Sequence, residues 1–261
     1  MRRTATRARH QMDDDMNQPP RNRDYLINVI NPNTTESMTA LIAEAARASA
    51  SPQTRIIGRT SSFGPASIEG HYDEALATIG MLRAVEAGDK DGADAHVIAC
   101  FGDPGLLAAR EITAAPVLGI AEAAMRAASF VATHFSVVTT LSRTRVIAEH
   151  LLRNYGLEQI CRKVRAVDVA VLDLDKPESN VRGLLLGECR AALTQDGIGA
   201  IVLGCAGMAD LAEELSTELG IPVIDGVAAA VRFAEALIGL GLKTSKYGDL
   251  AFPIPKARTV I

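Results

Sequence analysis

The sequence of 261 residues contains no tryptophan, and aromatic residues make up only 4% of it. Alanine, valine, leucine and isoleucine must therefore fill the interior. A net charge of −4 provides no basic surface of the kind that binds nucleic acid or an anionic membrane. No apolar run approaches the roughly 18–20 residues that a membrane span needs. The composition thus predicts a globular protein whose partners include neither nucleic acid nor a membrane.

Metal-binding and cofactor-binding motifs are also missing. The four cysteines, at positions 100, 161, 189 and 205, show no CxxC pair and no other zinc-type spacing. Without a secretory signal, free thiols in a reducing cytoplasm are expected. Neither a Walker A loop nor a complete GxGxxG fingerprint occurs, which agrees with a protein that uses no cofactor. We therefore expect a cytoplasmic protein without metal or cofactor.

Beyond a polar segment at its start, the chain alternates strands and helices. Residues 1–24 are rich in arginine and aspartate and almost free of apolar side chains, which predicts a disordered tail. Such alternation of strands and helices is typical of parallel sheets. The predicted strands cover 26–30, 55–60, 97–100, 117–120, 135–139, 164–171, 201–205 and 222–224, and the predicted helices cover 38–46, 72–87, 106–110, 121–129, 143–155, 178–193, 208–219 and 227–240.

The same order of elements occurs twice in the chain. Gly92 lies eight residues before Cys100, and Gly197 lies eight residues before Cys205. This duplication predicts an α/β protein of two similar domains, each a parallel four-stranded sheet flanked by helices. A pseudo-two-fold axis would relate the domains and place the active site in the cleft between them.

Each predicted domain carries one cysteine at the end of a buried strand. The first domain is expected to comprise residues 25–120 with about 228–261 and to carry Cys100. The second is expected to comprise residues 121–227 and to carry Cys205. Ligands of open α/β sheets bind at the carboxyl ends of the strands. The two thiols should therefore lie on opposite walls of the cleft.

A pair of opposed thiols can act as a base and an acid. A thiol just before a helix lies near the positive end of that helix, which lowers its pKa and favours the thiolate. A thiolate on one face of a molecule and a thiol on the other can invert a carbon next to a carbonyl. A lone buried cysteine is more often a small hydrophobic residue. Cys161 and Cys189 have no counterpart in the other half, so we interpret them as structural.

Polar residues in equivalent turns are candidates for substrate binding. Asn33 follows the first strand of one half, and Thr139 and Thr140 follow that of the other. Each could also cap a helix, and Asn33 has capping-box spacing to Glu36. Ser67 and Ile68 are predicted to form a rim, and Asp103 lies beside Cys100 in a turn. The neighbouring acidic residues Glu69, Asp73 and Glu74 read as solvated or capping, and His71 as structural.

Five short motifs resemble the Asp/Glu/hydantoin racemase superfamily, in its hydantoin and allantoin racemase branch. They are Ile-Asn-Pro-Asn-Thr at 30–34, Ser-Ile-Glu-Gly at 67–70, Cys-Phe-Gly-Asp-Pro-Gly-Leu at 100–106, Val-Thr-Thr-Leu at 138–141 and Gly-Cys-Ala-Gly-Met at 204–208. The motifs add Phe101, Gly102, Leu141, Ala206 and Gly207 to the candidate binding residues.

This resemblance implies a cofactor-independent racemisation of a 5-substituted hydantoin. Cys100 would be the base for one enantiomer and Cys205 for the other, each acting as acid for the opposite hand. The resemblance also implies a homo-oligomer, a tetramer or a hexamer. The segment 243–253 and the turn at 101–103 look more like allantoin racemases of purine degradation, so allantoin is expected as substrate before 5-alkyl or 5-aryl hydantoins.

Other functions leave part of the sequence unexplained. An amino-acid racemase would need a clamp for the free carboxylate, and neither cysteine turn contains an arginine. A two-lobe binding protein would fit two α/β domains but would give the thiol pair no role. A redox dithiol would require the two sulfurs to form a disulfide.

Overall fold

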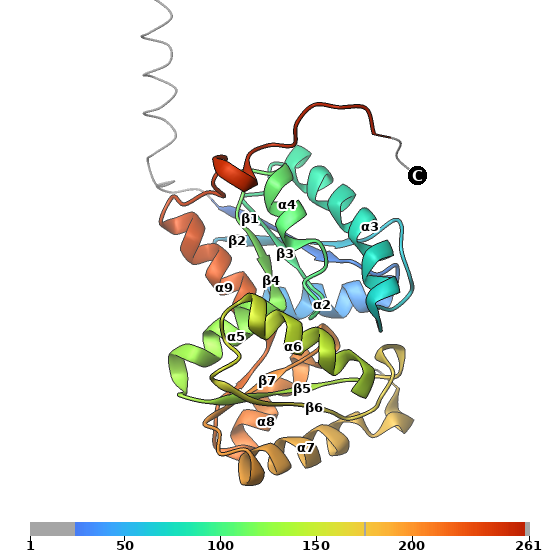
Figure 1. Cartoon of the computed structure of the whole chain (residues 1–261), viewed down its shortest axis with the longest axis vertical. Coiled ribbons are helices and arrows are strands. Elements are labelled where there is room, and N and C mark those ends of the chain that lie inside the picture. The colour runs from blue at the N-terminus through green and yellow to red at the C-terminus, as the bar shows by residue number, and fades with distance from the viewer. Residues whose placement is uncertain (1–23, 175, 259–261) are drawn as a thin grey trace, which may run out of the picture.

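The computed structural model describes residues 24–174 and 176–258. It contains two parallel four-stranded sheets, with strand orders β2-β1-β3-β4 and β6-β5-β7-β8. The order is the same in both halves, so the predicted α/β architecture of two similar domains is confirmed (Figure 1). Except for Asp24, the predicted tail lies outside the described residues.

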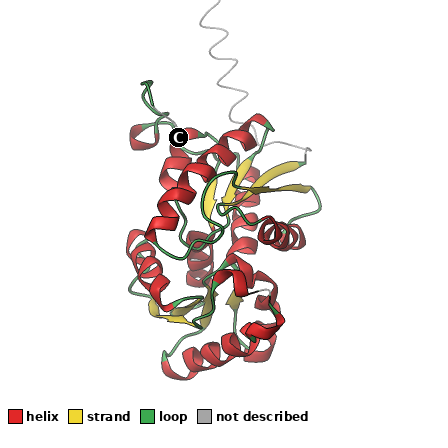
Figure 2. Ribbon diagram, turned by 90° about the vertical axis from the view of Figure 1, so that its right-hand side faces the viewer, coloured by secondary structure: helices red, strands yellow, loops and turns green. Residues whose placement is uncertain are grey.

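Each half follows the predicted alternation of strands and helices. Figure 2 shows helices around both sheets. The first half contains β1 (Tyr25–Asn31), α2 (Glu36–Ser49), β2 (Thr54–Thr60), α3 (His71–Lys90), β3 (Ala95–Ile98), α4 (Leu106–Ile112) and β4 (Val117–Gly119). The second contains α5 (Ile120–Val131), β5 (Phe135–Thr139), α6 (Arg145–Asn154), β6 (Cys161–Ala166), α7 (Val181–Gln195), β7 (Ala200–Leu203), α8 (Ala212–Leu219), β8 (Val223–Ile224) and α9 (Gly226–Gly239). None of the described helices has both the length and the hydropathy needed to cross a bilayer.

Two elements differ from the sequence prediction. The strand predicted over 164–171 is β6, which lies earlier and ends at Ala166. The helix predicted over 208–219 begins as a 3₁₀ turn, η4 (Ala206–Leu211), and becomes α-helical only in α8. Apolar side chains continue beyond β6, and Val171 is buried without belonging to a strand. Beyond Ala166, Val167 and Val169 still donate their N–H groups to the carbonyls of Thr139 and Thr140, at 3.1 and 3.2 Å, whereas the Val171 N–H donates to Glu69. The apolar alternation therefore continued past the strand to a buried residue that is not paired in the sheet.

The two domains exchange one helix each. Helix α5 follows β4 in the chain, yet Ala124 and Met125 pack with Phe135 of the second sheet. Helix α9 follows β8, yet its apolar face packs with Ile27 of the first sheet. The two helices also pack on each other, and Gly226 makes this possible. A Cβ added there would lie 2.6 Å from the carbonyl oxygen of Ile120.

The points where the chain passes from one sheet to the other indicate the limits of the domains. The chain passes from the first sheet to the second at the start of α5, and it returns at the start of α9 (Figure 1). On this basis we propose the same limits as the sequence suggested. Residues 25–120 with about 228–261 would form one domain, and residues 121–227 the other.

Candidate active site

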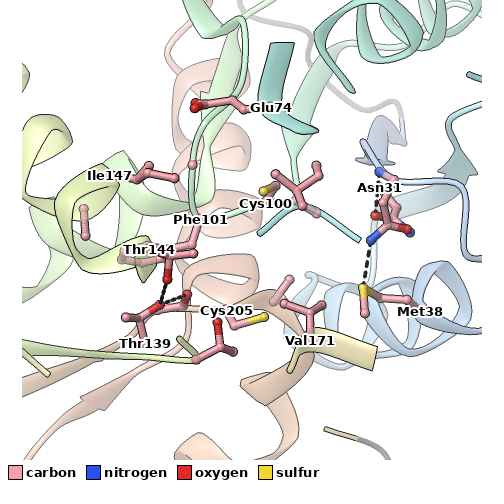
Figure 3. A pocket seen from close by; sticks show the side chains of 18 residues that line it. Asn31, Met38, Glu74, Cys100, Phe101, Thr139, Thr144, Ile147, Val171 and Cys205 are labelled. Carbon is pink, nitrogen blue, oxygen red and sulfur yellow. Dashed lines mark hydrogen bonds between the residues drawn. The ribbon is translucent and has the colours of Figure 1, made fainter. Parts of the chain in front are cut away.

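One pocket lies between the two sheets, at the carboxyl ends of their strands. It holds about 650 Å³ of empty space, its open mouth included. Cys100 enters it two residues after β3, and Cys205 two residues after β7 (Figure 3). The eighteen lining residues are Asn31, Asn33, Met38, Ile68, Glu74, Ala99, Cys100, Phe101, Gly102, Thr139, Thr140, Thr144, Ile147, Ala148, Val171, Gly204, Cys205 and Ala206. In the described part of the chain, no group of three or more His, Cys, Asp or Glu side chains could hold a metal ion.

The two cysteines occupy matching backbone turns. The residue before each cysteine, Ala99 or Gly204, donates its N–H to the adjacent strand at 2.8 Å. The N–H of the third residue after each cysteine bonds to the carbonyl of that cysteine, at 2.9 Å for Cys100 and 3.2 Å for Cys205. The sequence duplication therefore extends to the hydrogen bonds that position the thiols.

The residue after each cysteine anchors its turn in the opposite domain. Phe101 belongs to the apolar cluster of the second domain, which contains Met125 and Phe135. Ala206 belongs to the apolar cluster of the first domain, which contains Ile27. Each cysteine is thus fixed by the core of its own sheet on one side and by the other domain on the other. This packing fixes the shape of the pocket in the absence of a ligand.

Burial determines the protonation of Cys100. Removal from water raises the pKa of the Cys100 thiol to about 12, although the Gly102 N–H bonds to the sulfur and opposes the shift. Cys205, Asp103 and Glu74 add smaller upward contributions to this pKa. The sequence prediction of a lowered pKa is therefore wrong for Cys100. Helix α4 begins only at residue 106, too far away to offset the desolvation of the sulfur.

This raised pKa predicts how Cys100 reacts in the empty pocket. Its alkylation by iodoacetamide should be slow at pH 8 and should rise by about tenfold per pH unit up to pH 11, because the thiolate is the nucleophile. Short pulses followed by mass spectrometry of the Cys100 peptide would measure the rate, with glutathione as an unburied control. A rate that levels off near pH 9 would contradict the assignment.

The same ionisation affects folding. The folded pKa of Cys100 lies above the ordinary value of 9.0. Its contribution to stability is therefore complete below pH 9 and is lost as the pH rises toward 12. Circular dichroism should accompany each alkylation pulse, so that unfolding at high pH is not mistaken for thiolate formation.

On the first domain's side, Asn33 lies in the pocket as predicted but does not form the predicted capping box. Its Oδ1 accepts hydrogen bonds from Asn31 Nδ2 at 2.7 Å and from the N–H of Thr35 at 2.9 Å. Its Nδ2 contacts the Met38 sulfur at 3.1 Å. The N-cap of α2 is Thr35, and Glu36 is exposed. Asn33 is thus held firmly in place by an Asx turn.

The second domain contributes Thr139 and Thr140, as predicted. Thr139 Oγ1 donates to the carbonyl of Gly204 at 3.1 Å and lies 3.5 Å from Thr144 Oγ1. A Cβ on Gly204 would lie 2.7 Å from the Thr139 Cβ. Glycine before Cys205 therefore lets β5 and β7 approach closely at the pocket. Ile68, Phe101, Gly102 and Ala206 also line it, as the sequence suggested.

Four predicted binding residues do not line the pocket: Ser67, Asp103, Leu141 and Gly207. Asp103 has a clear structural role instead. Its carboxylate accepts hydrogen bonds from the N–H groups of Ala121 and Glu122 at 3.0 and 2.9 Å, at the start of α5. The Tyr155 hydroxyl donates to it at 2.6 Å. Burial nevertheless raises the pKa of Asp103 to about 6.

Sequence reasoning missed several pocket residues. Glu74 was interpreted as solvated or capping, but it lines the pocket and its pKa is raised by burial. Val171 reaches the pocket from a loop after β6. Glu69 joins the domains beside it, since its Oε1 accepts the Val171 N–H at 2.8 Å. The sequence placed Glu74 near the start of a predicted helix, but only the tertiary structure shows that this position faces the pocket between the domains.

Comparisons with known proteins agree on one family. The family model described as Asp/Glu/Hydantoin racemase matches residues 27–234. A hydantoin racemase from Rhizobium meliloti is 49% identical over 231 residues, which cover 88% of this chain and 96% of that protein. The structure of an allantoin racemase from Klebsiella pneumoniae aligns with a TM-score of 0.89 and 54% identity, covering 91% of this chain and 97% of the other.

A second solved structure gives the same result. The allantoin racemase from Pseudomonas fluorescens aligns with a TM-score of 0.87 and 42% identity, covering 90% of this chain and all of the other. These similarities extend over both domains and both cysteine turns of the present chain. The chain therefore belongs to the Asp/Glu/hydantoin racemase family, and it is an isomerase of the racemase type.

Proposed function

We propose that this racemase inverts C5 of a 5-substituted hydantoin, with allantoin as its preferred substrate. One observation carries the proposal: two thiols from matching turns of opposite domains line the same pocket. The relatives named hydantoin racemase and allantoin racemase support a ring of this kind as substrate. The apolar side chains of Ile147 and Val171 also line the pocket. Because they could contact an alkyl group, 5-alkyl hydantoins are the second candidate substrates.

The proposed reaction needs only two proton transfers. One cysteine, as thiolate, removes the proton from C5, and the electron pair of the C–H bond moves into the adjacent ring carbonyl as an enolate. The thiol of the other cysteine then donates its proton to the opposite face of C5. The base ends as a thiol and the acid as a thiolate, so atoms and charge balance without a cofactor or a metal.

The structure suggests which roles the thiols have at the start. Burial favours the neutral thiol of Cys100 in the empty pocket, so Cys100 would have to lose its proton before acting as the base for one enantiomer. The Gly102 N–H bonds to its sulfur and would stabilise the thiolate that forms after donation. Asn33, Thr139 and Thr140 would bind the polar ring edges. Ile68, Phe101, Gly102 and Ala206 would shape the walls.

The remaining expectations belong to the same proposal. The enzyme would act in the cytoplasm as a homo-oligomer, a tetramer or a hexamer, without nucleic acid or membrane partners. Exposed apolar side chains on α5 and α9 fit an oligomer surface, since Phe130 is 74% exposed and lies against Phe233.

Racemisation in D₂O tests the proposal. Single enantiomers of allantoin, 5-methylhydantoin and 5-benzylhydantoin should lose optical rotation and gain deuterium at C5, with allantoin turning over fastest. L-Aspartate and L-glutamate should be unchanged, and samples without enzyme would correct for spontaneous exchange. Turnover of the amino acids alone would replace the proposal with an amino-acid racemase. Ligand binding without any turnover would favour a binding protein.

A further inference from the structure

Among the described residues that line the pocket, Glu74 is the only ionisable side chain besides the two cysteines. It lies in the first turn of α3 and enters from the Cys100 side, apart from Asn31 and Met38 (Figure 3). Its side chain is about three-quarters buried, with 26% of it exposed. A Cβ built on Gly102 would lie 3.5 Å from Glu74 Oε1, so this oxygen lies beside the Cys100 turn.

The two carboxylate oxygens of Glu74 have different surroundings. Oε2 lies 3.6 Å from Nδ1 of His71, whose ring stacks on that of His150 in α6. Oε1 faces the backbone of Gly102 at the pocket. Burial raises the pKa of Glu74, and the two histidines oppose that shift. A carboxylate placed in this way is most stable when a donor in the pocket replaces the water it has lost.

Glu74 also breaks the symmetry of the pocket. The cysteine turns match each other, as do the turns of Asn33 and Thr139 after β1 and β5. Helix α7, which occupies the place of α3 in the second half, contributes no residue to the pocket. The matched groups suit a reaction that exchanges a proton between two faces. An unmatched acceptor suits the part of the substrate that does not exchange, the substituent on C5.

Inversion leaves this substituent nearly in place. When C5 loses its proton it becomes planar, and the substituent lies in the plane of the ring for either enantiomer. A single acceptor at the edge of the pocket can therefore hold the substituent of both enantiomers and of the enolate between them. Such an interaction orients the ring between the thiols, which matters because proton transfer depends on alignment.

We propose that Glu74 is a specificity-determining residue that accepts hydrogen bonds from N–H groups on the C5 substituent. This inference rests on the proposed function and deepens it. The site would select hydantoins whose substituent carries a urea-type or amide-type N–H group over those with an alkyl substituent of the same size. An alkyl group would leave the largely buried carboxylate without a donor, and a site built for a hydrogen bond discriminates strongly against that loss.

A pair of substrates matched in size tests the inference. Allantoin carries a ureido group of four heavy atoms, and 5-isobutylhydantoin carries four carbons. Glu74→Met should lower the ratio of kcat/KM for allantoin to that for 5-isobutylhydantoin by about tenfold or more, mainly by raising KM for allantoin. Glu74→Gln, which keeps an uncharged acceptor, should give a smaller shift. Glu86→Met, at an exposed position of the same helix, should not change the ratio.

The possible outcomes separate the two proposals. If the wild type racemises neither hydantoin, the proposed function fails. If the wild type racemises them but Glu74→Met and Glu74→Gln lower both substrates equally, the function stands and the role of Glu74 in specificity is overturned. Circular dichroism would show whether Glu74→Met folds. If it does not, Glu74→Gln decides alone, and an unchanged ratio for that variant overturns the inference.

Discussion

Replacing either Cys100 or Cys205 by serine should lower kcat/KM for racemisation by about a thousandfold or more. General acid–base groups contribute about 10²–10⁴ each, and a serine hydroxyl has far too high a pKa to supply a comparable base. The loss should appear in kcat, because the rest of the pocket remains to bind substrate. Polarimetry with single enantiomers of allantoin measures it.

Isotope exchange distinguishes a two-base mechanism from a general loss of structure. With one cysteine left, only the enantiomer whose C5–H faces that cysteine can be deprotonated. That enantiomer should then gain deuterium without inversion. The Cys100→Ser and Cys205→Ser variants should therefore exchange opposite enantiomers. Cys161→Ser, outside the pocket, is the matched control and should racemise like the wild type. Wild-type racemisation by either pocket variant would contradict the mechanism.

The duplicated sequence explains why the fold could be predicted in detail. Because the pattern occurs twice, each element could be predicted from two separate stretches of the sequence. Apolar periodicity located most of the strands and helices. The prediction of β6 was wrong because buried residues beyond Ala166 continue the alternation. Instead of pairing in a strand, the Val171 N–H donates to Glu69 of the other domain. Local patterns register burial but do not identify the partner that causes it.

The site, like the fold, could be predicted only in part from the sequence. The cysteines could be found because they occur at matching positions, and Asn33, Thr139 and Thr140 followed from the same symmetry. Glu74 has no counterpart, so duplication gave no signal for it. The protonation of Cys100 depends on its desolvation by both domains, which no sequence pattern records. Asp103 adjoins the Cys100 turn in sequence, but its backbone adopts a positive φ of 44° and its side chain is directed to α5 rather than to the pocket.

The role of Asp103 leads to the largest expected effect on stability. Asp103→Ala removes the acceptor of three hydrogen bonds and leaves two N–H groups at the start of α5 without their cap. At pH 5 and below, losing a cap and buried hydrogen bonds of this kind should cost about 2–4 kcal/mol in the free energy of unfolding. For a chain of this size, that corresponds to a fall in Tm of about 5–12 °C. Tyr155→Phe, which removes one donor, should cost only about 1 kcal/mol.

The pH dependence of the stability that Asp103 contributes distinguishes this capping role from substrate binding. Burial raises the pKa of Asp103 from 3.8 to about 6, so its contribution to stability is complete below pH 4 and is lost as the pH rises through 6. The difference in unfolding free energy between the wild type and Asp103→Ala should thus be larger at pH 5 than at pH 8. Denaturant titrations at both pH values measure that difference, and KM of the folded variant should stay near the wild-type value. A variant with wild-type stability and a raised KM would instead make Asp103 a binding residue.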